Sequence, residues 1–260
     1  MSRTAIIAGQ GVLPGLLAEA LDNPAVYAVE GFAPGIPARS FRYERLVPLL
    51  DQLAADGIGR VVFAGAVRRP RLDPEAFDPR TAALVPRVAA AMGRGDDALL
   101  RELIAIFEEW DLTVVGAEAI RPDLIAAAGV LAGSPSAADR ADAARAAEIL
   151  SVTGPLDIGQ GCVVAGGLCL AIETLPGTAP MLDFVARTRA ERRGGVLFKA
   201  PKPGQDRRID LPAIGPETIT QASAAGLSGI AWAAGGVLVL DGAAMVAAAE
   251  KAGLFLWARD

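Results

Sequence analysis

Residues 4–23 read TAIIAGQGVLPGLLAEALDN, and this stretch decides the first half of the fold. The run TAIIAG is short and apolar and ends in glycine, which indicates a buried β-strand. The following VLPGLLAEALDN indicates a helix, because Pro14 near its first turn lacks an N–H that would be unpaired there anyway. A strand that enters a helix through a glycine turn is typical of an α/β sheet.

The alternation of strand and helix continues beyond this stretch. Further strands are expected at residues 25–31, 59–67 and 111–120, and further helices at residues 44–57 and 96–110. Because strands joined by helices run parallel, we expect an N-terminal Rossmann-like, doubly wound parallel sheet.

A Gly-Ser-Pro-Ser cluster at residues 133–136 interrupts this pattern and is the best linker candidate. It predicts two domains, residues 1–133 and 134–260. Ser136 is a candidate N-cap for a helix that runs to residue 154. Glycine-rich apolar runs follow at residues 161–173, 195–201 and 235–241, and they predict a second α/β domain with a mixed sheet.

Composition excludes several function classes. The chain has 260 residues, a net charge of −5 and 52% hydrophobic residues, so neither disorder nor nucleic-acid binding is expected. It has 0 histidines, which excludes Ser-His-Asp triads, Cys-His pairs and histidine-ligated zinc. Acid–base chemistry would fall to Asp, Glu, Lys, Tyr, Cys or metal-bound water.

The remaining composition signals favour a cytoplasmic protein. Cys162 and Cys169 are too few for a disulfide framework, and we interpret them as reduced thiols. The N-terminus does not have the pattern of a signal peptide, and no run reaches the ~20 apolar residues of a membrane span.

The glycine turn after the first strand leaves three alternatives open. Gly9 and Gly11 would let a ligand approach the backbone at a helix N-terminus, which suits phosphate or a nucleotide. Glu30 ends the next strand, where a dinucleotide fold places its ribose-binding acid. However, Pro14 replaces the third glycine of that fingerprint. A structural turn, a phosphate or nucleotide contact, and a nicotinamide or flavin site all fit.

A charged segment, KAPKPGQDRRID at residues 199–210, lies between apolar runs. Its prolines favour extended chain, in which side chains alternate between two faces. Four charged residues would then share one face: Lys202, Asp206, Arg208 and Asp210. Ile209 and Leu211 would point the other way and anchor the segment.

Two carboxylates and two cations on one surface suit metal-assisted chemistry at phosphorus. Mg²⁺ binds carboxylate oxygens, water and phosphate, while Lys and Arg neutralise the remaining phosphate charge. The alternative is a solvated hairpin whose ion pairs are worth under about 1 kcal/mol each.

The chain resembles the LpxI-type UDP-2,3-diacylglucosamine pyrophosphatases. The resemblance lies in KAPKPGQDRRIDLPAIGPETI from Lys199, IIAGQGVLPGLLA from Ile6, GDDALLREL from Gly95 and DIGQGCVVAGGLCLAIE from Asp157. It implies a two-domain enzyme with its site between the domains. It also implies Mg²⁺-dependent attack of water on the α-phosphorus of UDP-2,3-diacylglucosamine, giving lipid X and UMP in lipid A biosynthesis.

The resemblance also implies the residues of the site. The essential aspartate maps onto Asp206 or Asp210, which are also the metal-ligand candidates. The other catalytic candidates are Lys199, Lys202, Gln205 and Arg208. The substrate-binding candidates are Gly9, Gly11, Leu13, Asp157, Gln160 and Thr218.

One segment departs from the family pattern. Residues 171–182 read AIETLPGTAPML, with Pro176 and Ala179 at positions where the family pattern has acidic residues. Two rivals to the hydrolase therefore stay open. One is a non-catalytic or divergent member that binds a nucleotide or lipid X, and the other is a nucleotide-cofactor oxidoreductase built on the N-terminal glycine turn.

Two arginine clusters are candidates for contact with phosphate or an anionic membrane surface, with solvated surface as the alternative. They are Arg68, Arg69 and Arg71, and Arg187, Arg189, Arg192 and Arg193. The resemblance implies peripheral contact with the inner membrane and leaves a homodimer open, while the net charge of −5 argues against a nucleic-acid partner.

Overall fold

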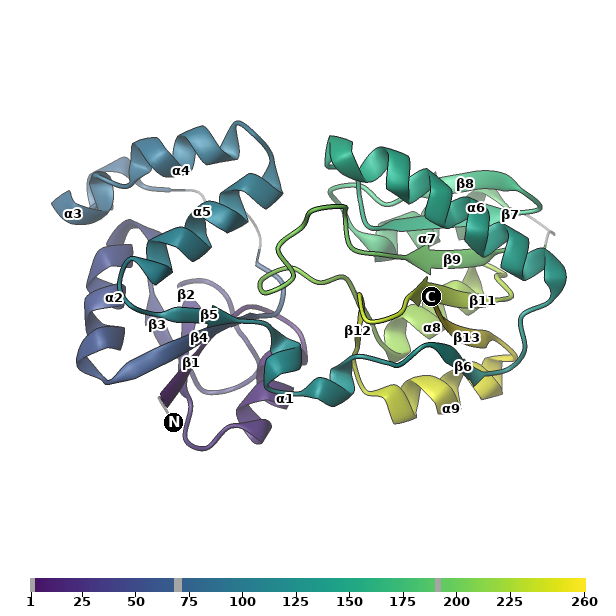
Figure 1. Cartoon of the computed structure of the whole chain (residues 1–260), viewed down its shortest axis with the longest axis horizontal. Coiled ribbons are helices and arrows are strands. Elements are labelled where there is room, and N and C mark those ends of the chain that lie inside the picture. Colours follow the sequence, from purple (N-terminus) through teal and green to yellow (C-terminus); the bar gives the residue numbers. More distant parts are fainter. Residues whose placement is uncertain (1–2, 68–71, 190–192) are drawn as a thin grey trace. The chain divides into compact units, whose positions relative to one another are not determined.

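The computed structural model describes residues 3–67, 72–189 and 193–260, and the chain divides into two compact units. The first unit extends to Pro122 and includes Asp206–Asp210. The second contains Asp123–Gln205 and Leu211–Asp260. Figure 1 shows that each unit has its own sheet with helices packed on it, so the α/β class is confirmed.

The first sheet is parallel throughout the described residues. Its strand order is β3-β2-β1-β4-β5, the arrangement of a Rossmann-like fold, as predicted. The strands are β1 (Arg3–Ala8), β2 (Ala25–Val29), β3 (Arg39–Phe41), β4 (Ile58–Ala64) and β5 (Thr113–Val115).

The helices of the first unit are α1 (Leu13–Ala20), α2 (Leu46–Ala55), α3 (Pro79–Ala82), α4 (Val85–Met92) and α5 (Asp96–Glu108). Leu50 of α2 and Ile104 of α5 pack with Ile7 of β1 in one buried cluster. Because strand residues alternate between faces, Ile6 points to the other side of the sheet. Helix α1 contacts β1 and β4. The apolar run at residues 4–8 is thus buried on both faces.

The second sheet is mixed, as predicted. Its order is β6-β13-β11-β9-β7-β8, in which β9, β11 and β13 are parallel, while β6 and β7 are antiparallel to their neighbours. The strands are β6 (Gly129–Ala132), β7 (Gly161–Ala165), β8 (Leu168–Ile172), β9 (Val196–Lys199), β11 (Gly229–Ala233) and β13 (Phe255–Arg259). A separate short pair is formed by β10 (Ala213–Ile214) and β12 (Leu238–Val239).

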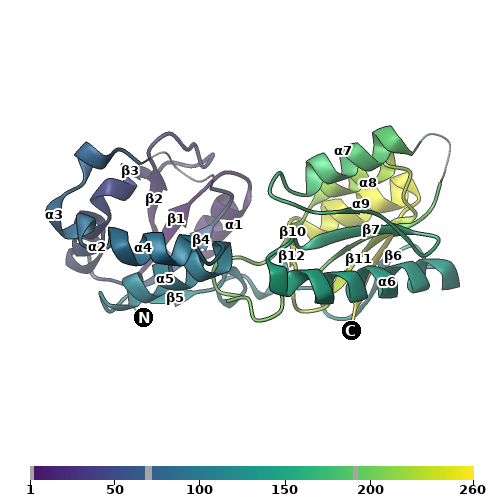
Figure 2. The same ribbon diagram turned by 90° about the horizontal axis from the view of Figure 1, so that it is seen from above.

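Helices cover both faces of the second sheet. They are α6 (Ala137–Thr153), α7 (Thr178–Thr188), α8 (Pro216–Ala224) and α9 (Gly242–Ala252). Figure 2 shows α6 on one face and α7, α8 and α9 on the other. Ser136 caps α6 through a reciprocal pair of hydrogen bonds with Asp139, which confirms the predicted N-cap. Within the described residues, no helix combines the length and apolarity needed to cross a bilayer.

The Gly-Ser-Pro-Ser cluster lies inside the second unit. Strand β6 pairs with β13, so the chain has joined the second sheet before it reaches Gly133. The cluster connects β6 to α6, and the division between the units falls at Pro122 and Asp123. Residues 123–133, which the sequence assigned to the first domain, therefore pack with the second.

A buried carboxylate ties α6 to the β7–β8 hairpin. Asp142 is 4% exposed, and its two oxygens accept hydrogen bonds from the backbone N–H groups of Gly166 and Gly167 at 2.9 and 2.7 Å. Both glycines have positive φ, at 58° and 78°, and form the turn of the hairpin. One side chain thus satisfies both donors of a turn that only glycine adopts easily.

We expect Asp142→Ala to lower the free energy of unfolding by about 2 kcal/mol, because two backbone donors lose a charged acceptor. Urea unfolding followed by tryptophan fluorescence measures the change. Glu148→Ala on the same helix is the control, since its side chain is 64% exposed and should contribute under about 0.5 kcal/mol. Equal effects of the two substitutions would contradict the tether.

Candidate functional site

A polar cluster lies at the end of β9, the last residue of which is Lys199. The ammonium of Lys199 donates to Thr178 Oγ1 at 2.6 Å and lies 3.4 Å from Glu173 Oε2 and from the carbonyl oxygen of Ala213. Lys199 is only 4% exposed. In α/β sheets, ligands bind beyond the carboxyl ends of the parallel strands, and this cluster occupies that position.

The backbone around Glu173 explains two glycines of the DIGQG motif. The N–H of Glu173 donates to the carbonyl of Gly161 at 2.7 Å, so β7 and β8 bring this acid beside the end of β9. A Cβ at Gly159 would collide with the Glu173 carbonyl, and one at Gly161 with the Glu173 carboxylate. The spacing of these glycines therefore makes room for Glu173.

The segment after Lys199 begins with a tight turn. The N–H of Gln205 donates to the carbonyl of Lys202 at 3.1 Å, and Gly204 between them has φ of +76°. Pro203 and Gly204 therefore occupy the central positions of a β-turn of the kind that favours Pro followed by Gly. This differs from the extended chain expected over residues 202–210, and the Pro-Gly dipeptide was the signal for it.

Gln205 holds this turn against the start of β7. Its side chain is buried, and its Oε1 accepts from the Lys202 N–H at 2.9 Å and from Gln160 Nε2 at 3.1 Å. The Lys202 ammonium reaches Asp157 Oδ1 at 2.5 Å. Four sequence-predicted residues are thus brought together in the second unit: Lys202, Gln205, Asp157 and Gln160.

The next residues form a second turn, closed by Asp206. Asp206 Oδ1 accepts from the Arg208 N–H at 3.0 Å, and the Arg208 guanidinium binds both Asp206 oxygens. Arg208 also donates to Glu108 Oε1 at 2.7 Å. Aspartate commonly closes such a turn on its own backbone, which is a second reason why the segment is not extended.

Three sequence-predicted residues of the segment lie in the first unit together with Ile209. Ile209 packs against the apolar core of that unit, as the anchoring interpretation expected. Asp206, Arg208 and Asp210 belong to the same unit. The charged segment thus supplies residues to the second unit as far as Gln205 and to the first unit from Asp206.

Electrostatics keep Asp206 ionised. The hydrogen bond from the Arg208 side chain is the main cause of a lowered pKa of Asp206, and burial opposes it only in part. The same pairing raises the pKa of Arg208. At neutral pH, Asp206 is therefore an anion and a hydrogen-bond acceptor, which suits a metal ligand or a base rather than an acid.

The N-terminal glycine turn has a structural explanation at Gly9. The Gly9 N–H donates to the carbonyl of Ala64 at 2.7 Å, and a Cβ there would lie 2.5 Å from the Ala66 carbonyl oxygen. Gly11 is different, because its φ is +103° and the space beside it is open. Leu13 is the first residue of α1 and is half-buried.

Thr218 serves the local structure of α8. Its hydroxyl accepts from the N–H of Gly215 at 3.2 Å, and its own N–H donates to the Gly215 carbonyl at 2.9 Å. This closes the N-terminus of the helix.

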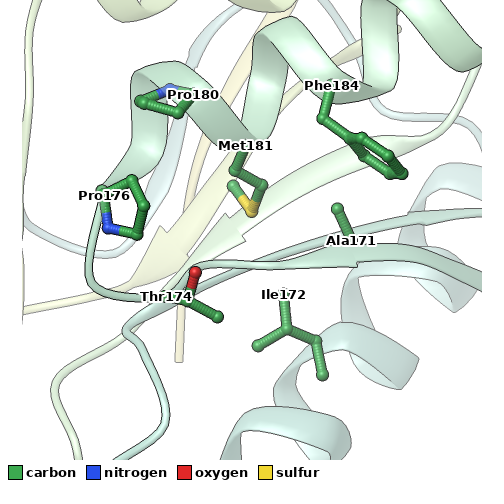
Figure 3. A pocket seen from close by; sticks show the side chains of 8 residues that line it. Ala171, Ile172, Thr174, Pro176, Pro180, Met181 and Phe184 are labelled. Carbon is green, nitrogen blue, oxygen red and sulfur yellow. The ribbon is translucent and has the colours of Figure 1, made fainter.

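An apolar groove begins next to the Lys199 cluster. Its volume is about 340 Å³, and it runs between β8 and α7. Figure 3 shows Met181 and Phe184 of α7 facing Ala171 of β8, with Thr174 and Pro176 at one end. Thr174 and Gly177 at this end directly adjoin Glu173 and Thr178 in the chain. A polar cluster and an apolar groove are therefore neighbours in the second unit.

The donor chemistry for a metal ion rests on Asp206 and Asp210. Their carboxylates are the hard oxygen donors that Mg²⁺ prefers, and Mg²⁺ commonly takes one or two carboxylates together with substrate phosphate and water. Among the described residues, no group of three or more His, Cys, Asp or Glu side chains is placed to hold a metal. The two carboxylates have the donor type that such an ion takes.

The arginine clusters are only partly described. Arg68, Arg69, Arg71 and Arg192 lie outside the described residues. Arg187 pairs with Asp183 at 3.0 Å on the exposed side of α7, and Arg189 donates to the Gly194 carbonyl at 2.7 Å.

Comparison with known proteins covers both units. Residues 3–124 match the family model described as the LpxI N-terminal domain, and residues 127–257 match the one described as the LpxI C-terminal domain. The UDP-2,3-diacylglucosamine pyrophosphatase LpxI of Caulobacter vibrioides is 40% identical over 275 aligned positions, which cover 100% of this chain and 98% of that protein.

We expect Arg208→Gln to raise the pKa of Asp206 toward its ordinary value near 4. A lowered pKa stabilises the fold above the unfolded-state pKa, and this contribution disappears as the pH falls through the folded-state value. Titration of the Asp206 carboxyl carbon by NMR measures the shift. The control is Arg207→Gln at the exposed neighbouring position, which should leave the titration of Asp206 nearly unchanged. If Arg208→Gln also left it unaltered, Arg208 would not be the cause of the lowered pKa of Asp206.

Proposed function

Since this chain belongs to the LpxI family, we propose that it is a UDP-2,3-diacylglucosamine pyrophosphatase of lipid A biosynthesis that uses a divalent cation. Water would attack the α-phosphorus and the bond from that phosphorus to the bridging oxygen would break. The products would be UMP, which carries the new oxygen, and lipid X, which keeps the other phosphate.

The observation that carries this proposal is the end-to-end match to both domains of the family. The match covers the charged segment and the DIGQG motif, which the structure connects through the hydrogen bond between Gln160 and Gln205. Lys202 and Asp157 pair beside this bond. The candidate residues for diphosphate hydrolysis would therefore lie in one continuous segment and beside the strand that supports it.

The residues present suit a hydrolase without histidine. Asp206, held ionised by Arg208, would position or deprotonate the attacking water together with Asp210. Lys202 and Arg208 would neutralise the diphosphate, and Gln205 would orient it by hydrogen bonding. Lys199 would act indirectly, by donating a hydrogen bond that positions the Thr178 hydroxyl.

Asp206 and Asp210 would hold a divalent cation, which would also bind the diphosphate of the substrate. Bound there, Mg²⁺ would withdraw charge from the phosphoryl oxygens and lower the pKa of a coordinated water. The protein would contribute the carboxylates and the surrounding cations.

The groove beside the Lys199 cluster would receive an acyl chain of the substrate. Its walls are mostly apolar, and Thr174 and Gly177 of its lining adjoin Glu173 and Thr178 in the chain, which would face the sugar or phosphate. Binding sites of a few hundred Å³ with apolar walls and few polar groups are typical of such ligands. We place the enzyme in the cytoplasm at the inner-membrane surface, because a diacylated substrate partitions into lipid.

The first test is turnover of UDP-2,3-diacylglucosamine in detergent with Mg²⁺ or with EDTA. We expect release of UMP and lipid X with Mg²⁺ only, and a fall in kcat of at least about 100-fold in Asp206→Asn or Asp210→Asn. In ¹⁸O-labelled water, the label should appear in UMP. Label in lipid X would instead assign the attack to the β-phosphorus.

Arg207→Gln, in the same segment, is the matched control and should keep most of the activity. Circular dichroism establishes that the aspartate variants remain folded. Tight binding of substrate or lipid X without turnover at any metal concentration would identify the chain as a binding protein and contradict the proposed hydrolase activity. The absence of both binding and turnover would contradict the proposed substrate.

For the groove, we expect Phe184→Glu to raise KM for the diacylated substrate about tenfold, which corresponds to a loss of about 1.4 kcal/mol of binding. Hydrolysis rates at a series of substrate concentrations give this value. Val152→Glu introduces the same charge at a residue that is 68% exposed on α6 and should leave KM unchanged. An unchanged KM in Phe184→Glu would exclude the groove as an acyl-chain site.

A further inference from the structure

The two cysteines of the chain lie side by side in the second unit. Cys162 is in β7 and Cys169 is in β8, the neighbouring strand of the hairpin in Figure 1. Both are free thiols, and their sulfur atoms are 3.8 Å apart. A disulfide needs about 2.05 Å between the sulfurs, so the two sulfurs must move toward each other before they can bond.

An irregularity in the hairpin creates this contact. Cys162 pairs with Ile172, but after a shift between Val163 and Val164, Val164 pairs with Cys169. Without the shift, Cys169 would stand opposite Ala165 and point to the other face of the sheet. With the shift, Cys169 pairs with Val164 and points to the same face of the sheet. Cys162, which is two residues from Val164 along β7, points to that face as well. The bulge is therefore what makes the two thiols neighbours.

The environments of the two thiols differ. Cys169 is exposed, whereas Cys162 is fully buried in a cluster with Ala143 and Ala146 of α6. Burial, followed by the proximity of Cys169, raises the pKa of the Cys162 thiol, while the Arg145 guanidinium acts in the opposite direction. An oxidant from solvent meets Cys169 first, and Cys162 is placed to react next.

We propose that Cys162 and Cys169 form a reversible disulfide when the protein meets a peroxide. The Cys169 thiolate would attack the peroxide and become a sulfenic acid, releasing the other peroxide oxygen as water or an alcohol. The Cys162 sulfur would then attack the Cys169 sulfur, and the departing hydroxide would take the Cys162 proton and leave as water. The net change converts two thiols and one peroxide to one disulfide and two waters, or to one disulfide, one water and one alcohol when the peroxide is organic.

This modification would act next to the polar cluster. Cys162 follows Gly161, whose carbonyl accepts the N–H of Glu173, and Glu173 pairs with Lys199. A cross-link here would fix the register of β7 and β8 where that register places Glu173. The hairpin geometry that brings the two thiols together is independent of the proposed hydrolysis.

The test treats the full chain with hydrogen peroxide, denatures it, blocks remaining thiols with N-ethylmaleimide and measures its mass. We expect a monomer that is lighter by two hydrogens and takes up no reagent, with both thiols recovered after dithiothreitol. Peptide mapping should locate both cysteines in one cross-linked peptide. Labelling of both thiols after oxidation, a disulfide-linked dimer, or sulfinic acid at Cys169 beside a labelled Cys162 would each overturn the proposal.

Two variants separate the steps. Cys162→Ala should accumulate at least about tenfold more dimedone-reactive sulfenic acid at Cys169 than the wild type, because the resolving thiol is absent. Cys169→Ser, a substitution at an exposed position that preserves folding, should leave Cys162 reduced and able to take up the reagent. Equal dimedone labelling of Cys162→Ala and the wild type would overturn the role of Cys162, and oxidation of Cys162 in Cys169→Ser would overturn the order of the steps.

Discussion

The ion pair of Lys199 and Glu173 is the interaction on which the site of the second unit depends. Lys199 is buried, and removing the partner of a buried charge costs about 3–5 kcal/mol. The pair fixes the register of three strands. Glu173 follows β8, Lys199 ends β9, and β7, which begins at Gly161, lies between β8 and β9 in the sheet. The Thr178 hydroxyl then brings the start of α7 to the same point.

Much of the architecture was readable from the sequence, and the reasons are local. The apolar run at residues 4–8 is buried on both sides, so it gave a strong strand signal, and Ser136 was recognisable as a cap by its position before a helix. Strand β3 escaped detection because its three residues, RSF, are mostly exposed and polar. The domain boundary was placed too late because β6 reads as a loop until its partner β13 is known.

The geometry of the candidate site is less predictable from the sequence than the fold, for a physical reason. Residue types in the charged segment indicated phosphate chemistry, but their directions are set by two turns, one closed by Pro203 and Gly204 and the other by Asp206. The partners of Lys199 come from β8 and α7, which lie far from the segment in sequence order. Glu173 is recognisable in the sequence as an acid at a strand end, and the glycines of the DIGQG motif mark the space that its backbone and carboxylate require.

The first unit is completed by residues that come from late in the chain. Ile209 packs against its apolar core, and Arg208 reaches Glu108 at the end of α5, although the rest of that unit ends at Pro122. A ribosome therefore finishes the first unit only after it has synthesised most of the second. A gene fragment that stops at the end of the Rossmann-like sheet would lack the packing of Ile209 and the pair of Arg208 with Glu108. Recombination in evolution would thus be expected to transmit the two units as one inherited block.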